Sequence, residues 1–281
     1  MLNFTKMHGA GNDYIYVNCF AEQLPGPPAE LAVKISDRRF GVGGDGLILI
    51  EPSHIADARM RMFNADGSEA EMCGNGIRCV AKYVYDHGLA RTEQLAIETA
   101  SGVLQVALEL ENGAVSRVTV DMGEPKLQPN DVPTTLDSQP VVNFQTHFAG
   151  VTLAVTAVSM GNPHCVIFVP QATDELVLGL GPKIESDPRF PKRTNVEFVE
   201  VLSQTELRQR TWERGSGETW ACGTGASAVC VAGVLCGLTQ RQVLIHLRGG
   251  DLQLRWDEAS NRVLMTGGAT EVFSGQWPHV A

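Results

Sequence analysis

The sequence is poor in several features that mark common classes of protein. Only 6% of its 281 residues are aromatic, which leaves no obvious platform for stacking bases or sugars. The 22 Lys and Arg residues are outnumbered by 32 Asp and Glu residues, and the formal net charge is −10. Such a chain repels phosphate backbones, so we expect no nucleic-acid partner. It contains no apolar run of about 18 residues and no signal-like N-terminus, so we expect neither a membrane span nor secretion.

Motifs that bind metals or dinucleotides are also missing. The seven histidines form no HExxH and the seven cysteines form no CxxC, so we expect no metal. Gly41, Gly43 and Gly46 have dinucleotide-binding spacing, but a helical stretch precedes them and a strand-like stretch follows. A phosphate-binding turn needs the opposite order. Without a secretion signal, the odd cysteine count predicts free thiols in a reducing cytoplasm.

What the sequence does contain is a long internal repeat. FNADGSEAEMCGNG (63–76) aligns with WERGSGETWACGTG (212–225) at an offset of 149 positions, which places Cys73 over Cys222. Gly11-Asn12 likewise aligns with Gly161-Asn162, and further matches keep the same order over nearly the whole chain. Repeated matches in register predict that one architecture has been duplicated.

Each half predicts the same local structure. An apolar helical stretch follows each Cys-Gly-x-Gly, at 77–87 and 226–236, and each ends at a glycine suited to the left-handed position beyond a helix. Strand-like runs follow at 104–110, 116–122, 242–247, 252–256 and 262–266, and Glu-Asn-Gly at 111–113 predicts a hairpin turn.

These elements predict an α+β fold of two pseudo-symmetric halves. Each half is expected to be a mainly antiparallel sheet that curls around one central helix, with the active site in the cleft between the halves. The proline-rich segment 123–140 predicts the boundary, so the first half covers 1–122 and the second covers 123–267.

The two repeat-related cysteines are the candidate reactive groups. Cys73 and Cys222 each open a helix, where unpaired N–H groups and the helix dipole are expected to lower the pKa of a thiol. Two such thiols on opposite sides of a substrate could invert a carbon centre, one as base and the other as acid. A buried packing role and a redox-active disulfide remain the alternatives for this pair. The other five cysteines are predicted to pack in helices or strands: Cys19, Cys79, Cys165, Cys230 and Cys236.

Polar residues in glycine-rich loops are the candidate binding groups. Amide side chains suit recognition of a zwitterion, although each is also a common turn residue; they are Asn12, Asn64, Asn162 and Asn195. Glu213 and Arg214 could bind an ammonium and a carboxylate, or form a surface ion pair. His164 could orient or deprotonate a thiol, or be structural.

The chain closely resembles the diaminopimelate epimerase family over essentially its full length. The resemblance rests on five segments: KMHGAGNDY (6–14), FNADGSEAEMCGNGIRC (63–79), VSMGNPHCV (158–166), RFPKRTNVEF (189–198) and ERGSGETWACGTGASA (213–228). It implies a cofactor-free isomerase that interconverts LL- and meso-diaminopimelate in lysine and peptidoglycan synthesis. It also implies that 268–281 returns to complete the first half and that the protein is a homodimer.

The resemblance further implies a role for each candidate residue. Cys73 and Cys222 would be the acid and base, assisted by His164 and Glu213. The reacting carboxylate would be held by Gly74, Asn75, Gly223 and Thr224. The rest of the substrate would be bound by Asn12, Asn64, Asn162, Asn195, Glu213 and Arg214.

Two positions depart from the family pattern. Many relatives carry Gln where this chain has Gly46, so one substrate hydrogen bond is expected to be missing or replaced by water. Some carry Tyr at a dimer contact where this chain has Phe273. Other interpretations of the sequence are a racemase of another amino acid such as proline, a non-catalytic amino-acid-binding module, and a redox switch.

Overall fold

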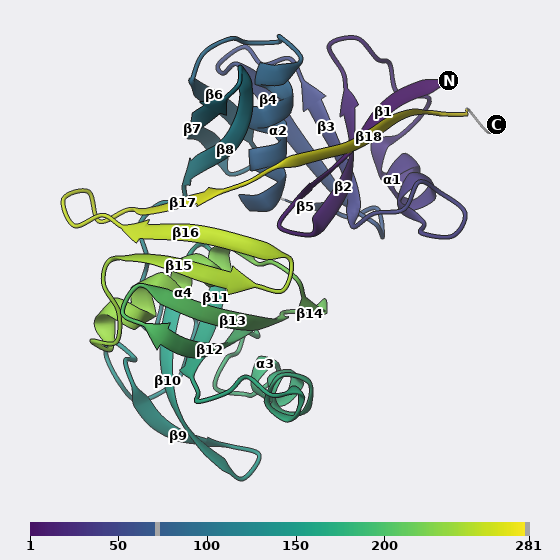
Figure 1. The fold of residues 1–281 in the computed structure, drawn as a ribbon. Helices are drawn as coiled ribbons and strands as arrows, with labels where there is room; N and C mark the ends of the chain where they lie inside the picture. The colour runs from purple at the N-terminus through teal and green to yellow at the C-terminus, as the bar shows by residue number, and fades with distance from the viewer. Residues whose placement is uncertain (71–73, 279–281) are drawn as a thin grey trace. The chain divides into compact units, whose positions relative to one another are not determined.

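The computed structural model describes residues 1–70 and 74–278, and the chain separates into two compact units (Figure 1). Unit 1 comprises Met1–Val120 and Gly267–Ala281, and unit 2 comprises Asp121–Thr266. None of the helices within the described residues is long and apolar enough to cross a lipid bilayer.

Unit 1 is a mixed, mainly antiparallel sheet with two helices. Its elements are β1 (Leu2–Gly9), β2 (Asn12–Asn18), α1 (Pro28–Ser36), β3 (Gly46–Glu51), β4 (Ala58–Asn64), β5 (Glu69–Ala70), α2 (Gly74–Asp86), β6 (Gln94–Thr99), β7 (Gly102–Glu111), β8 (Ala114–Asp121) and β18 (Thr270–Trp277). The pairs β1–β2, β3–β4, β6–β7 and β7–β8 are antiparallel, whereas β2–β3 and β4–β6 are parallel. The C-terminal β18 pairs antiparallel with β1.

Unit 2 contains the corresponding set of elements. They are β9 (Phe144–Phe148), β10 (Val151–Ser159), β11 (Pro163–Phe168), the π-helix η1 (Glu175–Leu180), α3 (Gly181–Glu185), β12 (Asn195–Ser203), β13 (Glu206–Glu213), β14 (Gly217–Thr219), α4 (Gly223–Leu235), β15 (Gln242–Leu247), β16 (Gly250–Trp256) and β17 (Val263–Gly267). Here β10–β11, β12–β13 and β15–β16 are antiparallel, and β11–β12 and β13–β15 are parallel.

The order of antiparallel and parallel pairs is therefore the same in both units, as the sequence repeat predicts. The register agrees as well. Phe63 pairs with Glu69 between β4 and β5, and the repeat-related Trp212 pairs with Glu218 between β13 and β14. The predicted α+β class with two similar, mainly antiparallel halves is confirmed.

In each unit one 13-residue helix packs across five strands of the sheet. The helix α2 contacts β1, β2, β4, β6 and β7, and α4 contacts β10, β11, β12, β15 and β16 (Figure 1). Residues 226–232 of α4 are fully buried, which explains why this helix is apolar all round. Both helices end as predicted, because Gly88 and Gly237 adopt φ of +74° and +68°.

The predicted hairpin is confirmed: Asn112 and Gly113, both with positive φ, form the two-residue turn between β7 and β8. The proline-rich segment 123–140, which was predicted as the boundary between the halves, packs into unit 2. Its Val132 and Leu136 are buried in the hydrophobic core of unit 2, against strands and the η1 and α3 helices.

Candidate active site

The candidate thiol of unit 2 lies at the start of α4, where Cys222 is the N-cap residue. Its backbone is extended, and Sγ accepts a hydrogen bond from the N–H of Gly225 at 3.4 Å. The hydroxyl of Thr224 lies 3.5 Å from the same sulfur. Within the described part of the chain, the N–H groups of Gly223 and Thr224 have no acceptor. These two donors, at the positive end of the helix dipole, suit a carboxylate ligand.

The thiol of Cys222 is not activated in the way that its helix position predicts. Burial raises its pKa well above the ordinary value, and the negative charges of Glu213 and Glu197 add to the increase. Hydrogen bonds from Thr224 and Gly225 act in the opposite direction but are outweighed. The expectation of a lowered pKa is therefore wrong for this state of the protein, because desolvation exceeds the effect of the helix terminus.

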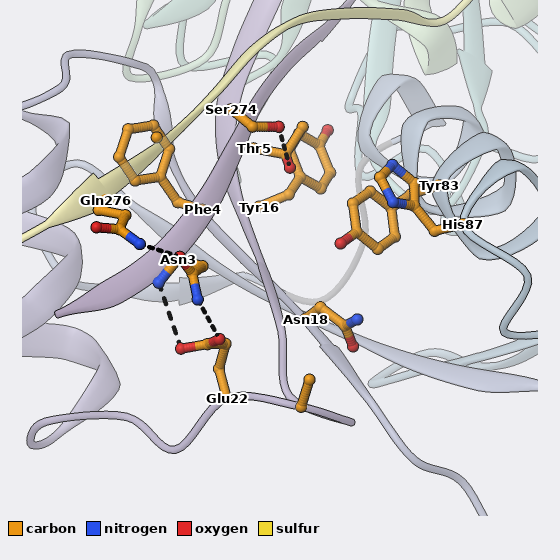
Figure 2. A pocket seen from close by; sticks show the side chains of 12 residues that line it. Asn3, Phe4, Thr5, Tyr16, Asn18, Glu22, Tyr83, His87, Ser274 and Gln276 are labelled. Carbon is orange, nitrogen blue, oxygen red and sulfur yellow. Dashed lines mark hydrogen bonds between the residues drawn. The ribbon is translucent and has the colours of Figure 1, made fainter.

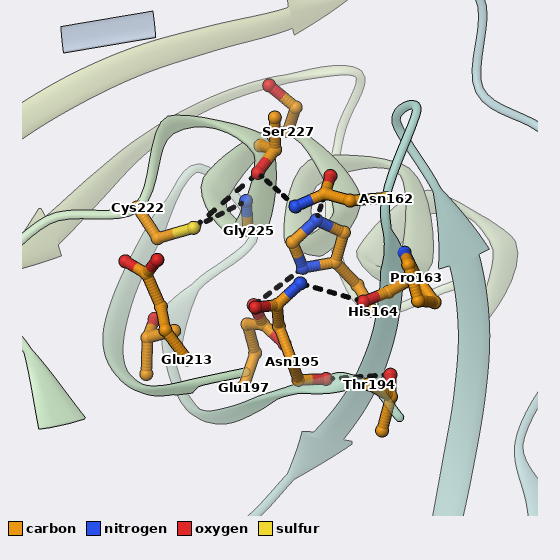
Figure 3. A network of polar contacts seen from close by, with 12 residues as sticks. Asn162, Pro163, His164, Thr194, Asn195, Glu197, Glu213, Cys222, Gly225 and Ser227 are labelled. Atoms are coloured by element: carbon orange, nitrogen blue, oxygen red, sulfur yellow. Dashed lines mark hydrogen bonds and ion pairs between the residues drawn. The ribbon is translucent and has the colours of Figure 1, made fainter. Parts of the chain in front are cut away.

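His164 lies fully buried on β11 beneath this helix start (Figure 3). Its Nε2 atom is 2.9 Å from the Oδ1 atom of Asn162, and its Nδ1 atom is 2.8 Å from Oε1 of Glu197. The Nδ2 group of Asn162 in turn donates to Thr224 Oγ1 at 3.3 Å. His164 and Asn162 thus reach Cys222 through Thr224 rather than by direct contact.

Glu213 ends β13, and its carboxylate approaches the Cys222 side chain (Figure 3). Burial raises the pKa of this carboxyl and the negative charge of Glu197 adds to the increase, whereas hydrogen bonds from Thr219 and Cys222 oppose it. A positively charged group bound beside Glu213 would lower this pKa again.

The backbone of Arg214 is hydrogen-bonded to the side chain of Asn195. The N–H of Arg214 donates to Oδ1 of Asn195 at 3.0 Å, and the amide of Asn195 donates to the Pro163 carbonyl at 2.9 Å. Asn195 therefore braces the turn that carries Glu213 and Arg214. The Arg214 guanidinium is exposed and donates to the carbonyl of Lys192 at 3.0 Å.

Three buried polar residues at this site were not predicted from the sequence. Glu197, Gln209 and Thr211 alternate along β12 and β13 on the face that α4 covers, and each is at most 2% exposed. The Gln209 amide donates to Thr211 at 2.9 Å. The available sequence signal was weak: β12 alternates polar and apolar residues at its start and β13 is largely polar, which is also typical of a half-exposed sheet.

In unit 1, the candidate residues are placed by α2 and the neighbouring loops. Gly74 and Asn75 form the buried first turn of α2. Cys73, the predicted partner of Cys222, lies outside the described residues.

The side-chain amides of Asn12 and Asn64 in unit 1 form hydrogen bonds with residues of neighbouring loops. Asn12 begins β2 and donates to Oδ2 of Asp45 at 2.7 Å. Arg38 spans the Asp45 and Asp13 carboxylates at 2.8 and 2.7 Å, which fixes this loop electrostatically. Asn64, at the end of β4, donates to the Ser68 hydroxyl at 3.0 Å. No role was predicted for Arg38 or Asp13 from the sequence.

Gly46 occupies a position that admits no side chain in this backbone. A Cβ atom there would lie 2.1 Å from the carbonyl oxygen of Phe63 and 2.7 Å from the ring of Tyr14. The glycine is thus required by the close approach of β2, β3 and β4. A Gln at this position needs a different local backbone.

A cavity of unit 1 is lined by none of these residues (Figure 2). It measures about 470 Å³ and is lined by β1, β2, β18 and the end of α2, with Glu22, Tyr16, Tyr83 and His87 among its walls. Phe273 lies on the same β18 strand, 48% exposed, in edge-to-face contact with Phe4.

All six cysteines that the structure describes are free thiols. The predicted packing role fits Cys79, Cys165 and Cys230, which are fully buried. Burial raises the pKa of Cys19 to about 11 and that of Cys230 to about 12, so neither is a thiolate at neutral pH.

Comparisons with known proteins agree with the motifs and the fold. The family model described as diaminopimelate epimerase matches residues 4–128 and 156–272. Proteins named diaminopimelate epimerase from Desulfovibrio desulfuricans and Moorella thermoacetica are 55% and 53% identical, over 98% and 99% of both chains. A phenazine biosynthesis protein of the PhzF family from Bacillus anthracis shares the fold at 16% identity, with a TM-score of 0.68 over 98% of both chains. A probable proline racemase from Agrobacterium radiobacter also has a TM-score of 0.68 at 15% identity, over 100% of this chain and 94% of the other. This chain belongs to the diaminopimelate epimerase family.

Proposed function

We propose that this protein is a cofactor-independent epimerase that converts LL-diaminopimelate to meso-diaminopimelate in lysine and peptidoglycan biosynthesis. The observation that carries the proposal is the buried Cys222 thiol at the start of α4, next to two helix N–H groups that can hold a carboxylate. Membership of the diaminopimelate epimerase family supports the choice of substrate.

Inversion of an α-carbon needs a base on one face and an acid on the other. We propose Cys222 as one of these groups and Cys73 as the other. Because its pKa is raised, Cys222 rests as the thiol and is ready to donate a proton. After one turnover the two residues exchange roles, since the donor has become a thiolate and the acceptor a thiol.

The substrate carboxylate gains negative charge as the α-proton leaves. We propose that the N–H groups of Gly223 and Thr224 stabilise this charge, because they are fixed in place before the reaction begins. Gly74 and Asn75 are proposed to do the same from the first turn of α2.

The remaining ionic groups of the substrate are proposed to bind to the polar loops. Glu213 pairs with an ammonium, whose positive charge also lowers the pKa of this carboxyl. Arg214, exposed and positively charged, binds the distal carboxylate. We propose that four side-chain amides form hydrogen bonds with the substrate: those of Asn12, Asn64, Asn162 and Asn195.

We also propose that the protein acts in the cytoplasm as a homodimer. Six free thiols fit a reducing compartment. Val272 and Phe273 are consecutive residues of β18, 53% and 48% exposed, and we propose that this strand offers an apolar contact for a second copy. Phe273→Asp should shift the mass measured by light scattering toward the monomer; an unchanged dimer mass would count against this contact.

The proposed activity is tested by incubating the purified protein with LL-diaminopimelate in deuterated water without added cofactor. We expect deuterium at the α-carbon together with formation of the meso isomer. L-proline and L-lysine serve as controls and should remain unlabelled. Label in proline but not in diaminopimelate would assign the protein to a different racemase, and no label in any of them would refute an α-proton-transfer enzyme.

A further inference from the structure

A continuous line of side chains connects the Cys222 sulfur with the buried Glu197 (Figure 3). It runs from Sγ to Thr224 Oγ1 at 3.5 Å, and from there to Asn162 Nδ2 at 3.3 Å. The same amide contacts His164 Nε2 through Oδ1 at 2.9 Å, and His164 Nδ1 contacts Glu197 Oε1 at 2.8 Å.

The direction of these hydrogen bonds is set by atoms that can only donate or only accept a proton. The Oδ1 atom of Asn162 can only accept, so His164 must carry a proton on Nε2. The Nδ2 group of Asn162 can only donate, so Thr224 accepts from it. The single O–H of Thr224 is then available to donate to the Cys222 sulfur, beside the N–H of Gly225.

The far end of the line is fixed by a proton shared between His164 and Glu197. With Nε2 protonated, Nδ1 either accepts a proton from a neutral Glu197 or is itself protonated against a carboxylate. Glu197 is fully buried, and its second oxygen has no hydrogen-bond partner among the described residues. A carboxylate with one partner in such a site is costly, which favours the neutral acid.

The burial of Glu197 favours the same state. His164 faces it from β11, Glu213 from β13 and Cys222 from the start of α4. Burial raises the pKa of Glu197, and only His164 acts in the opposite direction.

We propose that Glu197 is a positioning residue for Cys222: the proton that it shares with His164 orients Asn162 and Thr224 so that the last donor points at Sγ. The inference rests on the proposed function, in which Cys222 exchanges protons with the substrate. If the shared proton is lost, His164 can carry its own proton on Nδ1, and the side-chain amide of Asn162 can then turn over. The Thr224 hydroxyl would donate to the Asn162 amide oxygen instead of to Sγ. The thiolate of Cys222 loses a donor in that arrangement.

The test compares two substitutions that both remove the titratable carboxyl of Glu197. Glu197→Gln retains a donor toward Nδ1, whereas Glu197→Met has similar length and no donor. The measured quantity is the pH midpoint of Cys222 alkylation by iodoacetamide, followed on the Cys222 peptide by mass spectrometry. Restricted access of iodoacetamide to Cys222 lowers the rate of alkylation but does not move the pH midpoint of that rate.

We expect the midpoint in Glu197→Met to lie about one pH unit above that in Glu197→Gln, a tenfold lower thiolate fraction at a given pH. The value of kcat should fall with it while KM stays unchanged. Glu206→Gln is the matched control, because Glu206 makes a similar 2.8 Å contact with His246 on an exposed site. It should leave the midpoint unchanged.

Equal midpoints in the Gln and Met variants would overturn the proposal, because charge alone would then explain any effect. Should Glu197→Met fail to fold, ¹⁵N spectra of the His164 ring in the unmodified protein decide the question: protonated Nε2 supports the proposal, and a neutral ring protonated only on Nδ1 refutes it. Alkylation and ring spectra need no turnover. A protein without epimerase activity would therefore fail the deuterium test without affecting either measurement.

Discussion

Replacement of Gly225 by Ala tests how tightly the start of α4 is packed against the buried polar groups. A Cβ at this position would lie 2.5 Å from Glu197 Oε1, and 3.2 Å from both Cys222 Sγ and Gln209 Nε2. To reach ordinary van der Waals contact, the Glu197 carboxyl or the helix must move by about 1 Å. Glu197 is fully buried and bonded to His164 at 2.8 Å, so neither movement is free.

Two effects of opposite sign decide how much Gly225→Ala changes the free energy of unfolding. Ala favours a helix over Gly by about 1 kcal/mol. Overpacking of a closely packed site costs about 1–3 kcal/mol. Because the contact is far below van der Waals distance and the Glu197–His164 hydrogen bond is strained as well, we expect a net loss of roughly 1–2 kcal/mol in the free energy of unfolding. For a chain of this size that corresponds to a decrease in Tm of about 2–4 °C for each kcal/mol.

The assay is urea unfolding combined with steady-state kinetics on diaminopimelate. We expect kcat to fall about tenfold, because the displaced Glu197 no longer orients the groups that lead to Cys222. Gly179→Ala is the matched control, since Gly179 lies at an exposed position of η1 and a Cβ there meets nothing within 4 Å. If Gly225→Ala were as stable and as active as Gly179→Ala, the packing argument and the role given to Glu197 would both be refuted.

Three further predictions concern other parts of the molecule. Cys222→Ala and Cys73→Ala should each abolish conversion of LL- to meso-diaminopimelate in steady-state kinetics, and full turnover by either variant would exclude two-base catalysis. Gly46→Gln should lower Tm, because its Cβ would lie 2.1 Å from the Phe63 carbonyl, and an unchanged melting curve would contradict the close strand contact. Hydrogen bonds with two carboxylates raise the pKa of His246, so its contribution to stability is complete below about pH 6.5 and is lost as pH rises through the folded pKa. His246→Gln should therefore destabilise the protein more at about pH 6 than at about pH 9 in urea titrations, and an equal effect at both would disprove the linkage.

Much of the fold follows from short-range rules that the sequence displays directly. The hairpin at Asn112-Gly113 and the helix ends at Gly88 and Gly237 depend on backbone conformations that few residue types adopt. The duplication is visible because equivalent residues recur at a nearly constant offset. Family membership follows from the same motifs, which retain their spacing whatever the tertiary contacts.

The candidate site was only partly visible in the sequence. The position of Cys222 at the start of a helix follows from the glycine motif and the apolar run after it. The sign of its pKa shift does not, because that depends on burial and on carboxylates that come from β12 and β13. A local rule predicted activation by the helix terminus, and the low-dielectric surroundings outweigh it.

The sequence by itself determined the fold class, the duplication and the two motifs that carry the thiols. Only the tertiary structure decided which polar side chains surround the described thiol and in what state they hold it. Glu197 lies 33 positions from His164 and 25 from Cys222 in the sequence, but a parallel strand pair and an overlying helix place all three at one site. Backbone preferences act between neighbours in the chain, whereas desolvation and charge act through space, so only the folded arrangement fixes their balance.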